Sequence, residues 1–518
     1  MNNQVQPLKD KVSIYFFCLF PLALVTGPLI AEILMNFIVI VFLINTFLKK
    51  KFEFFKSLFF IFFISFYFYL VIVALLSEYN SQIIIKTLFY FRFIIFVLAI
   101  YEILKLQNNI AFLFFKFLGL ILLLLSIDGI YQYITGENFI GYKMYRPDRV
   151  SGFFDDRLVL GGYLIKVLPI FFSLFFFLNK RLNIHYKILS IFIILLTIVT
   201  IFISGDRSPF FQLILLLIGL IVFLNLSLKI KFSFVILFLI ITSFSLIYFK
   251  DLYSRHVVQT VNQLNLKKLD KKPFLKNFTY YYPMFSTSTK AFKDKKIIGY
   301  GPNTFRYFCN KPHLITYGEA KKVIKNDEIR LDLGWKFIHN KALIKEIIFN
   351  ENQKLNKGDL LFKYEIDNKV KNFNYNFDHI SFVKKIYIQK NLQVKHWKKI
   401  ADLNIGNFKK ETYVPISSCT THPHHYYFQL ISETGIIGFG TVLFIFFYFS
   451  YSLLRHLYSK IFYKKTIFNN SQICLILNFT MILLPFSTTG NFFNNWNNML
   501  MYLPIGFYVF FKRVYDQK

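Results

Sequence analysis

The sequence predicts an all-α polytopic membrane protein of about twelve transmembrane helices, with a large external loop that carries a small β-rich insert. Three observations predict this class. Long apolar runs recur along the 518 residues, which are 55% hydrophobic with a mean hydropathy of +0.45. The short segments between the runs alternate between basic and neutral or acidic composition. One polar stretch of about 175 residues interrupts the runs and is long enough for a small domain.

Each apolar run of about 20 residues is long enough to cross the ~30 Å hydrocarbon layer as a helix. We expect spans at 13–28, 30–48, 56–76, 84–104, 110–130, 158–178, 186–204, 209–227, 232–249, 427–454, 472–488 and 497–512. The chain then divides into spans within 1–249, a large loop at 250–426 with a β-like insert at about 310–418, and spans within 427–518.

Basic residues in short loops mark the cytoplasmic side of a membrane protein. With both termini cytoplasmic, the inside loops are the basic ones at 49–56, 180–187, 229–231 and 455–465. The external loops are then 77–81, 136–157, 204–208, 250–425 and 487–497. The first apolar run shows no small-residue cleavage site, so we interpret it as an uncleaved helix.

The formal charge of +33 raises nucleic acid as a partner. Lys, Asn, Ile and Phe are overused together, however, and many basic residues fall in short loops between apolar runs. Membrane topology and compositional bias therefore explain the charge better, and no nucleic-acid partner is predicted.

The middle of the large loop alternates like short strands, at 360–365, 380–383 and 386–388, after a turn at Lys357-Gly358-Asp359. Cys309 and Cys419 flank this insert and would face an oxidising compartment. A disulfide between them that staples the ends of the insert is therefore expected.

Arginines are scarce in this Lys-rich chain, yet they recur in the predicted external loops, as Arg146, Arg149, Arg157, Arg207 and Arg306. A guanidinium presents a planar fork of donors that grips phosphate. The alternative is that each arginine anchors a helix at the interface by snorkelling. Several arginines on one face favour an anion site.

The junction between the large loop and the next apolar run contains His422, His424 and His425. Helical spacing would place His425, Gln429 and Glu433 on one face, with Glu433 in the outer part of the membrane. A zinc site made of Cys419 and the three histidines is too crowded to match usual spacings, so no metal is predicted. Gly299-Tyr300-Gly301 is interpreted as a turn that presents nearby polar residues.

These segments resemble, in order, the O-antigen ligase and Wzy polymerase superfamily. His422-Pro423-His424, followed by Gly435 and Gly438, is similar to its His-Pro-His-Asn and Gly-x-x-Gly patterns, with His425 at the Asn position. Further similar segments precede it, at 131–136, 149–164, 204–208 and 298–305. The chain has no clear counterpart of the family's Arg-x-x-x-Trp stretch, for which Arg255 or the aromatic run 280–282 is a candidate substitute.

The resemblance implies a glycosyltransferase that moves a glycan from undecaprenyl diphosphate to an acceptor hydroxyl, at the periplasmic face of a bacterial inner membrane and without metal or cofactor. It implies His424 as the base or orienting group, with Arg149 and Arg207 on the diphosphate. Substrate-binding roles would fall to Asn303, Arg306, His422, Gln429 and Glu433. The implied partners are the lipid-linked glycan donor, membrane lipid, and lipid A core, protein or glycan as acceptor.

Other functions stay open at this point. An O-antigen or polysaccharide polymerase differs from a ligase only in its acceptor. A transporter or flippase for a lipid-linked sugar would place charges deep in several spans, where Arg92 and Lys166 are candidates. A scaffold built around the insert would leave the external arginines unexplained.

Overall fold

The structure is a computed structural model that describes residues 8–50, 52–107, 109–144, 149–229, 231–232, 250–258, 260–261, 281–323, 328–332, 342–366, 369–376, 381–394, 399–404 and 411–516. The chain forms two compact units. The helical unit comprises Met1–Lys272, Ser288–Tyr307 and His422–Lys518, and the β unit comprises Pro273–Thr287 and Phe308–Thr421.

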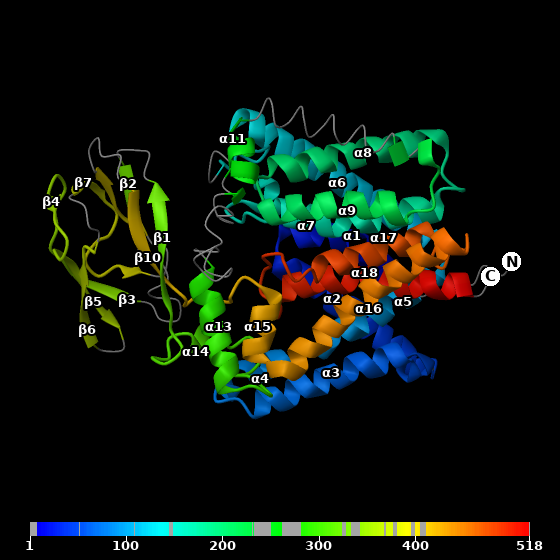
Figure 1. Ribbon diagram of the computed structural model, residues 1–518, viewed down its shortest axis with the longest axis horizontal. Helices are drawn as coiled ribbons and strands as arrows, with labels where there is room; N and C mark the ends of the chain where they lie inside the picture. Colours follow the sequence, from blue (N-terminus) through cyan, green and yellow to red (C-terminus); the bar gives the residue numbers. More distant parts are fainter. Residues whose placement is uncertain are drawn as a thin grey trace. The chain divides into compact units, whose positions relative to one another are not determined.

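The described part of the chain is mostly helical (Figure 1). The long helices are α1 (Leu8–Thr26), α2 (Pro28–Leu48), α3 (Leu58–Leu75), α5 (Phe91–Leu106), α6 (Ile110–Thr135), α7 (Leu160–Leu178), α8 (Ile184–Ile203), α9 (Arg207–Phe223), α13 (Tyr282–Asp294), α16 (Gly435–Phe462), α17 (Asn470–Ile482) and α18 (Asn495–Asp516). The short helices are η1 (Glu53–Lys56), α4 (Asn80–Leu88), η2 (Gly152–Phe154), α11 (Lys250–Tyr253), η3 (Ser254–Val258), α14 (Phe305–Phe308) and α15 (Tyr426–Glu433).

Among the described residues, seven helical segments are long and apolar enough to cross a membrane, fewer than the twelve predicted. They are Pro28–Leu48, Leu58–Leu75, Asn80–Leu106, Ile110–Thr135, Leu160–Leu178, Ile184–Ile203 and Gly435–Phe462. These apolar helices indicate a membrane protein.

The other five predicted spans are not among these seven segments, and the reason differs from one to the next. Two apolar helices are shorter than predicted, with 17 residues in α9 and 13 in α17. Charged residues occupy the first turn of α1, and α18 has asparagines near its start and basic residues near its end. The predicted span at 232–249 lies outside the described residues.

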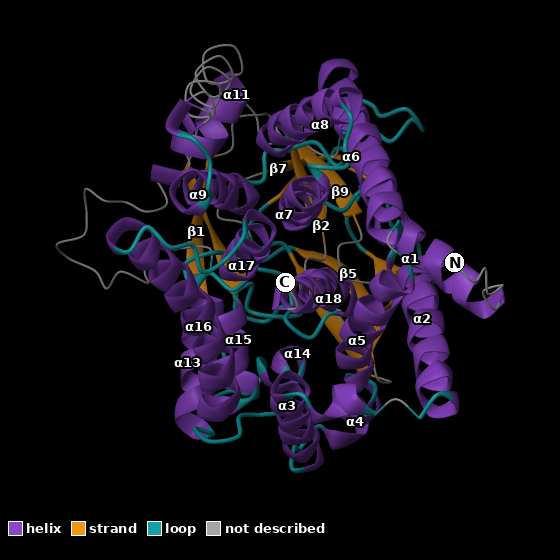
Figure 2. Ribbon diagram, turned by 90° about the vertical axis from the view of Figure 1, so that its right-hand side faces the viewer, coloured by secondary structure: helices purple, strands orange, loops and turns teal. Residues whose placement is uncertain are grey.

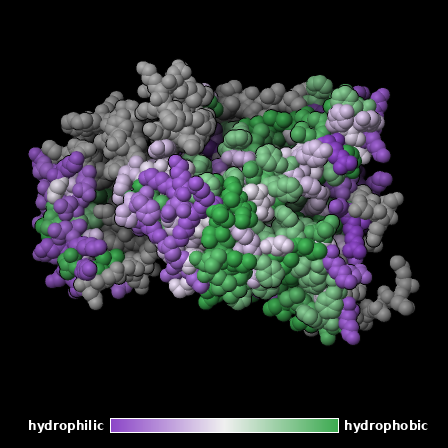
Figure 3. Space-filling view, turned by 60° about the horizontal axis from the view of Figure 1, so that its bottom comes forward, coloured by the Kyte–Doolittle hydropathy of each residue, from purple (hydrophilic) through white to green (hydrophobic). Residues whose placement is uncertain are grey.

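The helices pack around α18, which contacts α5, α7 and α17 and lies near the middle of the bundle seen end-on (Figure 2). Many large apolar side chains nevertheless point outward, among them Ile61, Phe68 and Ile72 on α3 and Phe444 and Phe447 on α16. Figure 3 shows the resulting broad hydrophobic surface over the helices, with hydrophilic residues at its right-hand end. Exposed apolar helix faces of this extent are expected where lipid is the solvent.

The predicted span 427–454 is wrong at its start, because the helix breaks at Thr434 and α16 begins only at Gly435. Gly435 has φ +58°, a conformation that glycine adopts readily. The backbone N–H groups of Gly301 and Ile436 bond to the carbonyls of Glu433 and Lys296, which fixes the break. Glu433 therefore ends the short helix α15 and lies outside the apolar span, contrary to expectation.

The β unit confirms the predicted β insert. Its strands are β1 (Tyr317–Val323), β2 (Glu328–Asp332), β3 (Ala342–Ile347), β4 (Lys354–Leu355), β5 (Leu360–Ile366), β6 (Lys369–Asn374), β7 (Ser381–Ile386), β8 (Gln393–Val394), β9 (Lys399–Asn404) and β10 (Glu411–Ser417). They form four-stranded sheets in the orders β2-β9-β7-β4 and β6-β5-β3-β8, and a separate β1-β10 pair.

A common core of alternating side chains, including Ile344, Phe362 and Val383, holds the two four-stranded sheets together. The predicted disulfide between Cys309 and Cys419 is present, with Cα atoms 5.1 Å apart, and it links the two ends of the insert covalently. The register of β1 with β10 runs from Tyr317 opposite Ser417 to Val323 opposite Glu411, so this pair brings the two ends of the insert together.

Candidate functional site

The short segment 485–491, which follows α17, joins parts of the helical unit that are far apart in sequence. Ser208 Oγ lies 2.5 Å from a serine hydroxyl of this segment and donates to one of its carbonyls at 3.0 Å. A backbone N–H of the segment donates to the His424 carbonyl at 2.9 Å, and His425 Nε2 donates to another of its carbonyls at 2.8 Å. The segment therefore ties the turn that carries Arg207 to the loop that carries the histidines.

His422 and His424 lie side by side, with ring centroids 4.2 Å apart. Burial lowers the pKa of His424 to about 4. Burial, with the nearby charges of His424 and Arg306, lowers the pKa of His422 well below its ordinary value. Both imidazoles are therefore neutral near pH 7.

The backbone at His424 is strained. Its φ is +55°, in the left-handed region that residues with a Cβ rarely occupy. Strain of this kind persists where the surroundings enforce it, and it concentrates at functional sites. Here the bond from the 485–491 segment to the His424 carbonyl helps to enforce it.

The carboxyl group of Glu433 is fully buried and holds the turn after Gly301. Its Oε2 accepts the backbone N–H of Asn303 at 2.8 Å and its Oε1 accepts that of Phe305 at 2.8 Å. Gln429 Nε2 donates to the same carboxyl at 3.0 Å. Burial raises the pKa of Glu433 to about 7, although these hydrogen bonds oppose the shift.

A chain of side-chain amides continues from this carboxyl. Gln429 Nε2 donates to Asn491 Oδ1 at 2.8 Å, and Asn491 Nδ2 donates to Asn303 Oδ1 at 2.8 Å. Arg306 donates to the same Asn303 oxygen at 3.2 Å. We call Asn303, Gln429, Glu433 and Asn491 the amide network, which orients Arg306.

A second arginine-rich region surrounds the turn between α8 and α9. Arg149 forms an ion pair with Asp206, and Arg255 Nε donates to the Gly205 carbonyl at 2.6 Å. Burial raises the pKa of Asp206, while the charges of Arg149 and Arg255 act in the opposite direction. We call Arg149, Asp206 and Arg255 the ion-paired cluster. Arg207 follows directly as the first residue of α9.

The loop 136–157 is held onto α6 by two buried polar side chains. Gln132 Oε1 accepts the backbone N–H groups of Ser151 and Gly152 at 3.0 and 2.7 Å. Asp128 Oδ1 accepts a backbone N–H of the same loop at 3.0 Å. These bonds fix the loop that carries Arg149. Arg157 is exposed, and Arg146 lies outside the described residues.

The expected face of His425, Gln429 and Glu433 forms only in part. Gln429 and Glu433 bond to each other, but His425 is the N-cap residue of α15, with φ −158°, and bonds to Pro485 instead. Sequence reasoning placed residues 487–497 in an external loop but gave them no role. The uncharged side chain of Asn491 offers no signal of function in the sequence alone.

The two charged span residues that a transporter would use, Arg92 and Lys166, both have partners. Arg92 lies 3.6 Å from the carboxylate of Glu32, and Lys166 donates to Asn497 at 3.2 Å. Cys419 is disulfide-bonded and hence is not a metal ligand. Within the described ranges, no group of three or more His, Cys, Asp or Glu side chains is placed to hold a metal ion.

No family model matches the chain, and a search of curated proteins finds no match to it.

Proposed function

We propose that this protein is a membrane glycosyltransferase that moves a glycan from undecaprenyl diphosphate to an acceptor hydroxyl, as the resemblance to the O-antigen ligase and Wzy polymerase superfamily implies. The observation that carries the proposal is the 485–491 segment. It bonds to Ser208, beside Arg207, to the His424 loop and, through Asn491, to the amide network that orients Arg306. Basic and proton-accepting groups from separate loops thus belong to one connected region.

The reaction needs a base at the acceptor and positive charge at the leaving group. The acceptor oxygen attacks the anomeric carbon of the donor sugar, and the bond from that carbon to the diphosphate oxygen breaks. Undecaprenyl diphosphate leaves with the electron pair, and the acceptor proton passes to His424. This buried imidazole is neutral near pH 7, as a general base must be, and its pKa of about 4 makes it a weak base in the absence of substrate.

Arg207 and Arg306 would stabilise the negative charge that develops on the diphosphate. Arg149 would act through the ion-paired cluster, in which two guanidinium groups and one carboxylate leave a net positive charge. Asn303, Gln429, Glu433 and His422 would hold these groups in place. This scheme requires no metal or other cofactor.

The proposed topology puts the site at the periplasmic face of a bacterial inner membrane, with both termini cytoplasmic. The C-terminal end of α18 lies at the opposite end of the bundle from α15, which supports it (Figure 1). About twelve spans would result if α1, α9, α17, α18 and the segment at 232–249 also cross. Local thinning of the bilayer would accommodate the shorter helices.

Reconstitution tests the proposal directly. The purified protein in liposomes is given undecaprenyl-diphosphate glycan with lipid A core, a protein or a second lipid-linked glycan as acceptor, and transfer is followed by a gel shift. We expect His424→Ala to lower the rate by about 10²–10⁴-fold and Arg207→Ala by about 10²–10³-fold. Transfer should persist in EDTA.

Matched controls are His185→Ala and Arg455→Ala, since both side chains are exposed and distant in sequence from the site. Transfer to lipid A core or to a protein would identify a ligase, and transfer to a second lipid-linked glycan would identify a polymerase. Equal transfer by the site and control variants would contradict the assignment. Movement of the lipid-linked glycan across the bilayer without transfer would instead identify a flippase.

A further inference from the structure

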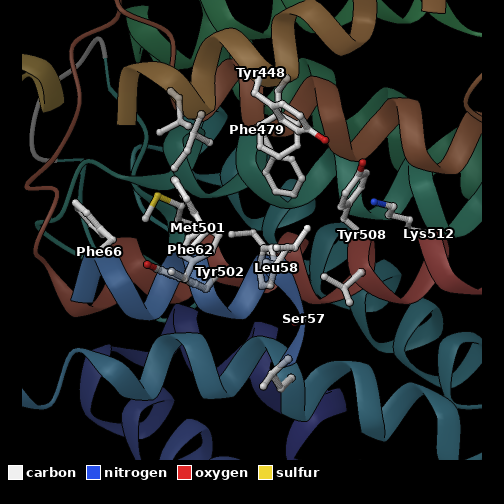
Figure 4. A pocket seen from close by; sticks show the side chains of 18 of the residues that line it. Ser57, Leu58, Phe62, Phe66, Tyr448, Phe479, Met501, Tyr502, Tyr508 and Lys512 are labelled. Carbon is white, nitrogen blue, oxygen red and sulfur yellow. The ribbon is translucent and has the colours of Figure 1, made fainter. Parts of the chain in front are cut away.

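An apolar cavity lies in the helical unit, with Phe492, which follows Asn491 of the amide network, and Lys512 near the C-terminal end of α18 among its lining residues. Its volume is about 740 Å³, within the usual range of ligand pockets. The walls come from α3, α16, α17 and α18 and are built mainly of aromatic and aliphatic side chains (Figure 4). Phe62, Phe449 and Ile505 are examples. Such a lining suits a hydrocarbon chain.

The positive charge of the cavity lining is concentrated at one end. Its only lining cations among the described residues are Lys512 and Arg513, near the C-terminal end of α18, and Figure 4 shows Lys512 beside Tyr508 at one side of the cavity and Phe66 at the other. A third cation lies close by, because Lys105 and Arg513 approach the same Tyr101 ring, at 5.2 and 5.7 Å.

The acidic residues at this end only partly offset these cations. Glu53 lines the cavity, and Glu102 pairs with Lys105 at 3.7 Å. The other end, where Leu483 and Phe492 line the wall, presents apolar side chains. The cavity is therefore complementary to a lipid: its apolar body suits an acyl chain, and its cationic mouth, formed by Lys512 and Arg513, suits an anionic headgroup.

We propose that this cavity binds one anionic phospholipid, with an acyl chain between α3 and α16 and its phosphate at Lys512 and Arg513. The arginines assigned to the donor diphosphate, Arg207 and Arg306, are not among the lining residues. The cationic mouth instead lies with the basic C-terminal end of α18. This favours a phospholipid of the adjoining leaflet over the donor, and the inference stands whether or not the proposed transfer reaction is correct.

Lipid retention tests the proposal. The full-length protein is purified in detergent and exchanged against phosphatidylglycerol or phosphatidylcholine, and bound lipid is counted by native mass spectrometry. We expect one phosphatidylglycerol to be retained preferentially. Lys512→Gln combined with Arg513→Gln should weaken its binding about tenfold, because each basic residue near the headgroup contributes attraction.

The matched control is Lys464→Gln with Lys465→Gln, which removes two exposed charges outside the cavity and should leave retention unchanged. Ile445→Trp, which narrows the cavity without a charge change, should also release the lipid. Equal retention of both phospholipids, or full retention by both cavity variants, would overturn the proposal. Preferential retention of undecaprenyl phosphate would assign the cavity to the donor chain and overturn it as well.

Discussion

The two arginine regions of the helical unit differ in what balances the guanidinium charge. In the ion-paired cluster, Arg149 faces the carboxylate of Asp206, and the two side chains are 19% and 9% exposed. In the amide network, Arg306 donates to an amide oxygen of Asn303, which carries no formal charge. The carboxyl of Glu433 in the same network has a pKa of about 7 and is only partly ionised near neutrality.

This difference indicates that the two regions have different roles. A buried ion pair contributes mainly by joining the segments that carry its partners, here the 136–157 loop and the turn before α9. Arg306 is oriented by a neutral amide, and the carboxyl whose pKa its charge lowers, that of Glu433, is only partly ionised, so Arg306 keeps more of its positive potential for an incoming anion. We therefore expect the ion-paired cluster to dominate stability and the amide network to dominate binding of the diphosphate.

The largest expected effect comes from breaking the ion pair. Asp206→Asn leaves Arg149 and Arg255 without the carboxylate that compensates their charges, and should lower the free energy of unfolding by about 3–5 kcal/mol. Thermal unfolding in detergent, followed by intrinsic fluorescence, measures the change. Arg149→Met with Asp206→Leu, which removes both charges together, should recover part of the loss.

The control for this test is Glu102→Gln. It breaks a pair with Lys105, which is 47% exposed, so a change within about 0.5 kcal/mol is expected. If Asp206→Asn were no more destabilising than Glu102→Gln, the ion-paired cluster would not have the structural role assigned to it.

A smaller effect is expected from the amide network. Asn491→Ala removes the acceptor for Gln429 and the donor to Asn303, and should cost about 1–3 kcal/mol of stability. It should also raise the KM for the lipid-linked donor, because Arg306 loses its orientation. Combining Asn491→Ala with Gln429→Ala should cost less than the sum of the single changes, since the two residues share a hydrogen bond.

Asn80→Ala serves as the control, because its side chain makes only a long, exposed bond of 3.4 Å. Additive losses for Asn491→Ala and Gln429→Ala would show that the two amides act independently. That result would contradict the network as a unit.

The sequence predicted the elements whose signal is local. The apolar runs marked the spans Leu58–Leu75 and Ile110–Thr135, and the alternation at 360–365 marked β5. It misplaced the start of the predicted span 427–454, because hydropathy alone does not register a chain break such as that at Thr434. That break depends on hydrogen bonds to residues more than a hundred positions away.

The site was predictable only where it used charged or titratable residues. Arg149, Arg306 and His424 attract notice because arginine and histidine are rare in this chain. Asn491 does not, because the chain is rich in asparagine and the role of this one arises from tertiary contacts with Gln429 and Asn303. Long-range pairing of neutral amides leaves no pattern in sequence spacing.

The smallest expected effect concerns the link between the two regions, His425, which bonds to the 485–491 segment. Burial lowers its pKa to about 4 in the folded protein, below the ordinary 6.5 that the unfolded chain retains. As the pH falls below about 6.5, the unfolded chain therefore binds a proton that the folded protein excludes, and stability is lost progressively toward pH 4. Between about pH 7.5 and pH 6 the loss from this residue should be about 1 kcal/mol.

His425→Asn removes the titrating group and places at this position the residue of the His-Pro-His-Asn pattern. Its unfolding temperature should fall less on acidification than that of the wild type, while exposed His185→Asn should show the wild-type slope. An unchanged slope in His425→Asn would mean that this imidazole is not buried neutral against Pro485. The 485–491 segment would then lose one of its contacts with the histidine loop, and the two arginine regions would be less firmly joined than the contacts indicate.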